Sequence, residues 1–193
     1  MVVLALWLVL LTGVFWAPPP RADLWPWVVR LMTGQWAGEN LLVVAEFNLM
    51  GVWPVLFAAL LRDRWFVGRW PALPFVVLSF FVGAYVLAPY FLWGDARREG
   101  QVSRAELSPR FRGVIGVLGI VAAGLGCLGF AYGDVSGWWE AVQTQQFVCL
   151  MSCDFAVLWA LFLMEARRRG GAWGWCGVPV VGAAVWLWLR PSD

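Results

Sequence analysis

The sequence predicts an all-α protein, a bundle of about six transmembrane helices, and three observations lead to this expectation. Of its 193 residues, 62% are hydrophobic and only 13% are charged, whereas soluble domains are about half apolar and a quarter charged. The mean hydropathy is +0.72, and a chain of this size has no interior large enough to bury so much apolar surface. Many of the 16 Trp residues lie near the ends of apolar runs, where indole rings favour the headgroup level.

Six apolar segments are long enough, or nearly so, to cross the hydrocarbon core, which takes about 20 residues. Because backbone polar groups in lipid must bond internally, each segment is expected to be helical. Together they predict one integral membrane domain spanning 1–193. The segments are 2–16, 40–61, 72–93, 113–133, 146–164 and 174–189.

The first segment is short, and it could be a cleaved signal peptide or a retained helix. No basic residue precedes it, and bulky residues and prolines follow it in "FWAPPPRAD". A signal peptide has a basic start and small residues at its cleavage site, so a retained helix is favoured. Residues 24–36 are apolar with charge only at Arg30 and are expected to lie in the membrane interface. Residues 94–112 are expected to be a solvated connector with a short surface helix at 103–107.

The distribution of Arg predicts the orientation, because cytoplasmic loops are enriched in basic residues. Six alternating spans place loops 17–39, 94–112 and 165–173 on one side, which should face the cytoplasm or the chloroplast stroma. Both termini and the loops 62–71 and 134–145 would lie on the opposite side. Arg62, Arg64 and Arg69 oppose this assignment. The Arg residues that support it are 21, 30, 97, 98, 104, 110, 112, 167, 168 and 169.

The basic residues are all Arg, and the chain contains no Lys and no His. Without His, the sequence excludes imidazole haem ligands, His-metal sites and Ser-His triads. Without Lys, it excludes Schiff-base chemistry and a P-loop. The net charge of +2 gives no basic patch for nucleic acid. No nucleophile–base pair is visible, which favours a non-enzymatic protein and leaves an enzyme as an open alternative.

The four Cys residues lie in apolar runs and are expected to be reduced and buried, with no disulfide framework. On a helical wheel, Cys149 and Cys153 point roughly 100–140° away from Asp154. The sequence therefore predicts no metal site.

Two carboxylates, Glu46 and Asp154, lie inside predicted spans, where ionisable groups are costly and are functional candidates. The alternating spans predict antiparallel helices for them, with Asp154 near the midplane and Glu46 about 7 Å shallower. No Arg lies at either depth, so each carboxyl should be protonated or should face water or hydrogen-bond donors. Candidate donors are Asn48, Ser152, Tyr85, Tyr90 and indole N–H groups.

Two interpretations of the site formed by Glu46, Asn48 and Asp154 remain open. It is either a relay or contact for a proton, ion or ligand, or a set of interhelical hydrogen bonds that fix packing, each worth about 1 kcal/mol.

The segment 113–133 is rich in glycine, and small residues let helices approach closely. Gly116, Gly119, Ala123 and Gly126 are the predicted packing residues. A flat pigment or a quinone against Gly and Trp faces is an alternative, although no cofactor is predicted.

Three stretches carry a family resemblance: "FNLMGVWPVLFAALLRDR" at 47–64, "PFVVLSFFVGAYVLAPYFLW" at 74–93 and "FVCLMSCDFAVLWALFLMEARRR" at 147–169. They resemble an uncharacterised multi-pass membrane protein family of cyanobacteria and plastids. The last stretch also resembles a small bacterial family of unknown function with an aspartate in an apolar helix. The resemblance implies a plasma or thylakoid membrane, and it implies no activity or site residues.

Three functions are expected from these observations. The first is a non-enzymatic accessory or assembly factor that contacts a larger membrane complex through its helices in the bilayer. A photosynthetic membrane is one setting for this function. The second is a small proton-coupled carrier or channel that uses Glu46 and Asp154. The third is a pigment- or quinone-binding membrane protein.

Overall fold

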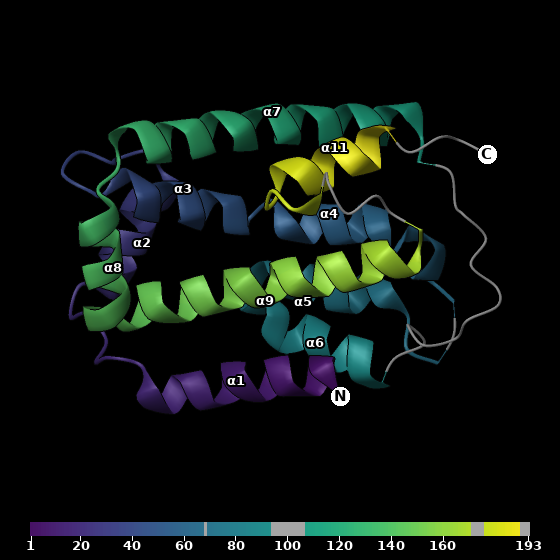
Figure 1. Cartoon of the computed structure of the whole chain (residues 1–193), viewed down its shortest axis with the longest axis horizontal. Helices are drawn as coiled ribbons and strands as arrows, with labels where there is room; N and C mark the ends of the chain where they lie inside the picture. Colours follow the sequence, from purple (N-terminus) through teal and green to yellow (C-terminus); the bar gives the residue numbers. More distant parts are fainter. Residues whose placement is uncertain (68, 94–106, 171–175, 190–193) are drawn as a thin grey trace.

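The computed structural model describes residues 1–67, 69–93, 107–170 and 176–189, and all regular elements in these ranges are helices (Figure 1). The predicted all-α class is therefore confirmed. Three helical stretches are long and apolar enough to cross a membrane: Leu41–Leu60, Pro109–Tyr132 and Gln146–Arg168. This is consistent with an integral membrane location, while six spans are not confirmed.

The three long stretches begin where the sequence supplies a cap or a helix start. Asn40 accepts the N–H of Leu42 at the start of α3 (Leu41–Met50). A turn at Gly51 and Val52 joins α3 to α4 (Trp53–Leu60), so the predicted segment 40–61 contains an interruption. Ser108 caps α7 (Pro109–Tyr132), and proline at the first position is compatible with a helix start. The third stretch is α9 (Gln146–Arg168).

Shorter helices flank the long ones. The first predicted segment is α1 (Val2–Trp16), and the expected interfacial piece contains the amphipathic helix α2 (Leu24–Met32). The expected loop 134–145 is instead a helix, α8 (Val135–Thr144), which Asp134 caps through the N–H of Ser136. The expected surface helix at 103–107 falls mainly outside the described residues.

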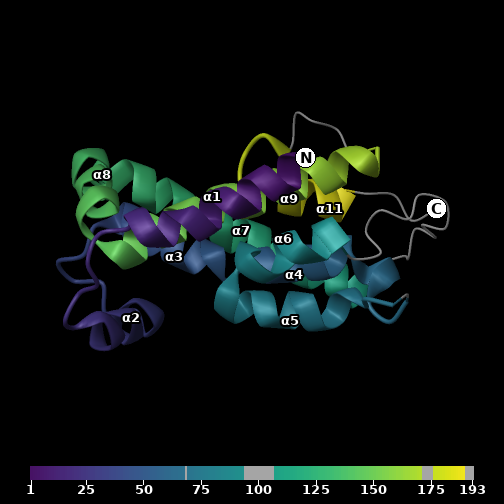
Figure 2. The ribbon, with the colours of Figure 1, turned by 90° about the horizontal axis from the view of Figure 1, so that it is seen from below.

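The segment 72–93 is not one spanning helix but a hairpin of two half-length helices, α5 (Ala72–Val82) and α6 (Ala84–Trp93). Figure 2 shows them one above the other, in the half of the molecule away from α8. The rings of Phe75 and Tyr90 lie 5.1 Å apart, as expected for positions equally far from the turn. Gly83, at φ 58° and ψ −133°, allows the reversal because L side chains rarely adopt this conformation.

The predicted segment 174–189 is also not a continuous helix. The described helix there is α11 (Val181–Leu189), which follows a turn with Val180 at φ 60°. Trp159 of α9 donates its indole N–H to the carbonyl of Cys176 at 3.0 Å. The stretch before α11 therefore lies beside the interior of α9 and not beside its end.

These short helices change which charged loops meet. Arg64 contacts Glu165 at 3.2 Å and Arg169 contacts Asp63 at 2.9 Å, so loop 62–71 and the end of α9 lie together. The guanidinium of Arg21 reaches Gln145, which directly precedes α9, at 3.4 Å. The prediction that loops 17–39 and 165–173 share a side is therefore wrong, because the hairpin α5/α6 returns the chain to the end it left.

An aromatic core joins α4, α6, α9 and α11. Trp53 and Phe57 of α4 both pack against Phe162 of α9 at ring distances of 5.7 Å. Phe162 in turn meets Trp186 of α11 at 6.0 Å. Figure 1 shows α9 between α1 and the pair α7 and α11. The core thus holds α9 at the centre of the bundle, with its buried face toward the hairpin.

Candidate functional site

The candidate site is the contact between Asp154 and the tip of the hairpin α5/α6. Asp154 follows the start of α9 by eight residues, or about 12 Å of helix rise, which places it well inside the helix. Its Oδ1 atom accepts the backbone N–H of Ala84 at 2.7 Å. Asp154 is 5% exposed and Ala84 is fully buried. A carboxylate of one helix therefore caps the first residue of another.

Gly83 lets the carboxylate come this close. A Cβ built on Gly83 would lie 2.7 Å from Asp154 Oδ1 and nearer still to Oδ2. Glycine is thus required at position 83 for two reasons: its backbone conformation, and the close approach of the Asp154 carboxylate. A Gly inside an apolar run carries little signal in the sequence, since such residues are common in membrane helices.

Tyr85 fixes the hairpin tip against α1. Its hydroxyl donates to the carbonyl of Leu10 at 3.2 Å, and its own carbonyl accepts the indole N–H of Trp7 at 3.3 Å. The sequence predicts Tyr85 as a candidate donor to a buried carboxyl, whereas its hydroxyl donates to the backbone of α1. Three helices, α1, α6 and α9, therefore meet through polar contacts in an otherwise apolar interior.

The electrostatics of this contact follow from helix geometry. The first N–H groups of a helix are not bonded within it, and the N-terminus carries partial positive charge. The start of α6 therefore favours an anionic oxygen at Asp154, while the apolar surroundings disfavour a bare charge. The partner of Asp154 is a backbone N–H group and not an Arg side chain, in keeping with the absence of Arg at this depth.

Glu46 has a separate partner. Its Oε2 atom accepts the indole N–H of Trp138, on α8, at 2.8 Å. Leu41 and Gln145 line one pocket, so α3 and α9 start at the same end of the molecule and run parallel. The antiparallel arrangement expected for these helices is therefore wrong. Glu46 follows Leu41 by five residues, about 8 Å, and lies nearer the α8 end than Asp154 does.

Asn48 does not join the two carboxylates. Its amide donates to the carbonyl of Val44, one turn earlier in α3, at 2.8 Å. Such a bond within one helix leaves the neighbouring helices unlinked by this side chain. The structure thus gives Glu46, Asn48 and Asp154 three different partners.

The predicted packing residues of α7 divide between two faces. Gly119 faces Ala184 of α11, where an added Cβ would lie 3.1 Å from the Ala184 Cβ atom, and Gly116 faces the ring of Trp188. Ala123 is half-buried. Gly126 has open space where its Cβ would be, so it lies outside this contact. Gly129, which the sequence analysis did not select, packs against Ala45 of α3.

A second buried polar group lies at the end of α9. Glu165, 1% exposed, accepts from Arg169 at 2.8 Å and pairs with Arg64 at 3.2 Å, while Arg169 also pairs with Asp63. The sequence signals were "RDR" at 62–64 and "EARRR" at 165–169. They were missed because the expected topology placed these loops on opposite sides.

Metal ligation finds no support in the described ranges, where no three His, Cys, Asp or Glu side chains gather closely enough to hold an ion. Cys127, Cys149, Cys153 and Cys176 are free thiols. No protein-family model, no curated protein and no solved structure matches this chain. The resemblance to a cyanobacterial and plastid membrane family therefore stays a prediction.

Proposed function

We propose that this protein is an integral membrane protein that moves protons or small cations through the bundle, with Asp154 as the central group. The observation that carries the proposal is the hydrogen bond from the Ala84 N–H group to Asp154 at the tip of a half-length hairpin. Intramembrane carboxylates that face a bundle interior are typical of proton and ion pathways. This function was the alternative to an accessory role in the sequence analysis.

The interrupted helices support this proposal. Non-helical backbone at membrane depth is tolerated only where protein buries it or where it lines a water-filled cavity. Transporters use such breaks to aim half-helix ends and free backbone groups at ions. Here the break at Gly83 presents the N–H of Ala84 to a carboxylate that pairs with no Arg within the described part of the chain.

The chemistry of the proposed step is proton exchange at the Asp154 carboxyl. The ionised form is favoured by the N-terminus of α6, since charged acceptors form the stronger hydrogen bonds. The neutral form is favoured by the apolar surroundings. A carboxyl under these opposing influences can take up and release a proton, and Glu46 is the next carboxyl toward the α8 end.

The orientation follows from the same arrangement. Most of the described Arg residues lie at the end where α9 terminates, whereas Arg21 and Arg30 lie at the other end. Under the positive-inside rule, the Arg-rich end faces the cytoplasm or an equivalent compartment. The end of the molecule that carries α8 then faces the opposite compartment. The residues at the Arg-rich end are Arg62, Arg64, Arg69, Arg110, Arg112, Arg167, Arg168 and Arg169.

A proteoliposome assay tests this proposal. The purified protein is reconstituted with a pH-sensitive dye inside the vesicles, and proton flux is driven by a potassium diffusion potential. Wild type should acidify the lumen faster than empty vesicles, and Asp154→Asn should abolish the difference. Glu140→Gln, at an exposed position of α8, is the matched control and should keep wild-type flux. Equal flux in Asp154→Asn and wild type would remove Asp154 from the pathway.

A second candidate function, an accessory protein that acts through helix contacts, is favoured by α7. This 24-residue helix is apolar enough to cross a membrane and lies along one edge of the bundle in Figure 1. Its outward positions include Gly124 and Gly126, which have open space around them. Purification in mild detergent tests this function: co-purification with a larger membrane complex supports it, and a protein that runs alone speaks against it. An absorbance spectrum of the same sample tests for a bound pigment.

A further inference from the structure

Two buried polar atoms without hydrogen-bond partners lie in the half of the bundle between Asp154 and the Arg-rich end. Tyr90 of α6 is 1% exposed, and its hydroxyl has no hydrogen-bond partner among the described residues. Glu165 of α9 is also 1% exposed, and its Oε2 atom has no such partner in the same part of the chain. Buried polar groups are nearly always satisfied in folded proteins, and buried water molecules often satisfy them. Each of these atoms is therefore suited to bind a water molecule.

Tyr90 stands between the carboxyl groups of Asp154 and Glu165. Helix α6 begins at Ala84, which donates its N–H to Asp154, and Tyr90 follows six residues later, about 9 Å along the helix. On α9, Glu165 follows Asp154 by eleven residues, about 16 Å. The charged groups that act on the Tyr90 hydroxyl include Glu165 and its partner Arg64, so α6 runs toward the end where α9 terminates. The Tyr90 hydroxyl therefore lies part of the way from Asp154 to Glu165.

Glu165 connects this half of the bundle to the solvent. Its Oε1 atom accepts from Arg169 at 2.8 Å and from Arg64 at 3.2 Å, so two guanidinium groups hold the carboxylate in place. Its Oε2 atom lies 3.8 Å from Arg168 Nη1, which is too far for a hydrogen bond. The side chain of Arg168 is 47% exposed. A water molecule on Glu165 Oε2 would therefore be one side chain away from the bulk solvent.

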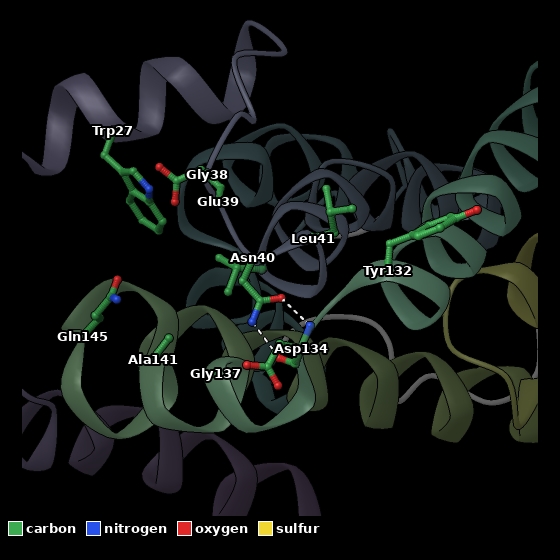
Figure 3. Close-up of a pocket in the computed structure, with 11 residues that line it drawn as sticks. Trp27, Gly38, Glu39, Asn40, Leu41, Tyr132, Asp134, Gly137, Ala141 and Gln145 are labelled. Atoms are coloured by element: carbon green, nitrogen blue, oxygen red, sulfur yellow. Dashed lines mark hydrogen bonds between the residues drawn. The ribbon is translucent and has the colours of Figure 1, made fainter.

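At the α8 end, a pocket lets solvent into the molecule. The pocket has a volume of about 520 Å³, and the carboxyl groups of Glu39 and Asp134 belong to its wall (Figure 3). Val43 of α3 also lines it, and Glu46 lies three residues, about 4.5 Å, deeper along that helix. Water in the pocket thus comes within about one helical turn of Glu46. The longer distance for a proton to cross lies between Asp154 and the Arg-rich end.

The polar groups in this half of the bundle suit a proton better than a metal cation. A hydroxyl can accept a proton on its oxygen while it donates its own, so Tyr90 can pass a proton on without being ionised. A metal cation instead needs several oxygen atoms at once to replace its hydration shell. No three Asp, Glu, Cys or His side chains gather for this purpose in the described residues. Arg64 and Arg169 also place positive charge at this end, which repels a metal cation.

We propose that the pathway through the bundle carries protons, and that the Tyr90 hydroxyl passes them from Asp154 to a water molecule at Glu165 Oε2. The Asp154 carboxyl gives its proton to a water molecule, which gives a proton to the Tyr90 oxygen. As this O–H bond forms, the original Tyr90 O–H bond breaks, and its proton goes to the water at Glu165, which releases one to the Arg-rich side. Both waters and the phenol end neutral, and only Asp154 changes charge. This step rests on the proposed function, because it begins at Asp154.

Flux measurements on the full chain in proteoliposomes test this inference. The same potassium diffusion potential drives all samples, with a pH-sensitive dye in one set of vesicles and a Na⁺-sensitive dye in another. Wild type should take up protons and should show no Na⁺ entry above that of empty vesicles. Tyr90→Phe removes only the hydroxyl oxygen and should lower proton flux at least about tenfold. Tyr132→Phe, the matched control, makes the same change at a position that is 75% exposed, where the hydroxyl points away from the pocket (Figure 3), and should keep wild-type flux.

The possible outcomes distinguish a failure of this inference from a failure of the proposed function. Wild-type proton flux in Tyr90→Phe, together with lost flux in Asp154→Asn, would overturn the role of Tyr90 and keep the proposed function. Na⁺ entry as fast as proton entry in wild type would overturn proton selectivity and also keep the proposed function, which includes small cations. No flux of either ion in wild type would overturn both. The comparison of the two ions in wild type tests the inference even if a variant fails to fold.

Discussion

Replacing Gly83 with Ala should destabilise the protein strongly, because the added methyl group causes both a conformational and a steric penalty. The first is conformational, since Gly83 has φ 58° and ψ −133°, a region that is essentially restricted to glycine. The second is steric, since the new Cβ would lie 2.7 Å from Asp154 Oδ1 and 2.5 Å from its carboxyl carbon. Either the hairpin or the carboxylate must move.

The two costs can be estimated separately. Holding Ala in this backbone conformation costs about 1–3 kcal/mol. Displacing Asp154 forfeits its hydrogen bond with the Ala84 N–H group, and such bonds to charged groups contribute about 1.5–3 kcal/mol. The total is roughly 2.5–6 kcal/mol, a large fraction of the typical stability of about 5–15 kcal/mol.

Denaturant unfolding in mild detergent measures this loss. Gly124→Ala is the control, since nothing lies within 4 Å of the position that its Cβ would occupy. It should change the free energy of unfolding by less than about 1 kcal/mol, and in the stabilising direction, because Ala is the better helix former. In an Asp154→Ala background, the same Gly83 substitution should cost only the conformational part, about 1–3 kcal/mol.

Two outcomes would refute this reasoning. If the free energy of unfolding of Gly83→Ala lies within about 1 kcal/mol of the wild-type value, the hairpin tip does not have the described backbone conformation. If Gly83→Ala lowers the free energy of unfolding by the same amount with and without the Asp154 carboxylate, Gly83 and Asp154 are not in contact. The second outcome would leave the hairpin in place but remove the basis of the proposed site.

Three further predictions concern other polar groups. Arg64→Ala removes one partner of the buried Glu165 carboxylate, which keeps Arg169, and should lower the free energy of unfolding by about 1.5–3 kcal/mol. Arg168→Ala, at a half-exposed position, should cost less than about 1 kcal/mol. Trp138→Phe removes the donor to Glu46 and should cost about 1–3 kcal/mol in the same denaturant assay. Hydrogen bonds at the start of α8, the side-chain one first, lower the pKa of Asp134 from 3.8, so its contribution to stability is present above that pH and is lost as the pH falls through the lowered value. Thermal midpoints from pH 7 to pH 3 should therefore fall less for Asp134→Asn than for wild type, and equal falls would contradict this.

One residue of the candidate site, Asp154, was visible in the sequence. Asp154 stood out because a carboxylate inside an apolar run is rare, and the structure buries it together with Leu158 and Glu165 of the same helix. Its actual partner was not predictable. A backbone N–H group carries no residue identity, and the donor at Ala84 exists only because the chain reverses at Gly83.

The topology was the main error of the sequence analysis, and its cause was physical. Hydropathy reports how many apolar residues follow one another and not whether they cross the bilayer or turn back inside it. The segment 72–93 has the length of a span, yet it folds as α5 and α6. That single reversal places Arg64 and Asp63 at the same end as the last turn of α9, whereas Arg21 lies at the start of α9.

The sequence by itself determined the helical class of this protein and indicated a membrane location, because composition and the length of apolar runs do not depend on how the chain folds. It also determined that Asp154 lies within a helix and that no Arg neutralises it from its own depth. Only the tertiary structure decided what this carboxylate contacts, which charged loops meet, and where a polar pocket opens. Those features depend on the direction that each helix takes after the preceding turn. The decisive turn here is at Gly83, which has no side chain and lies against the carboxylate of Asp154 from another helix.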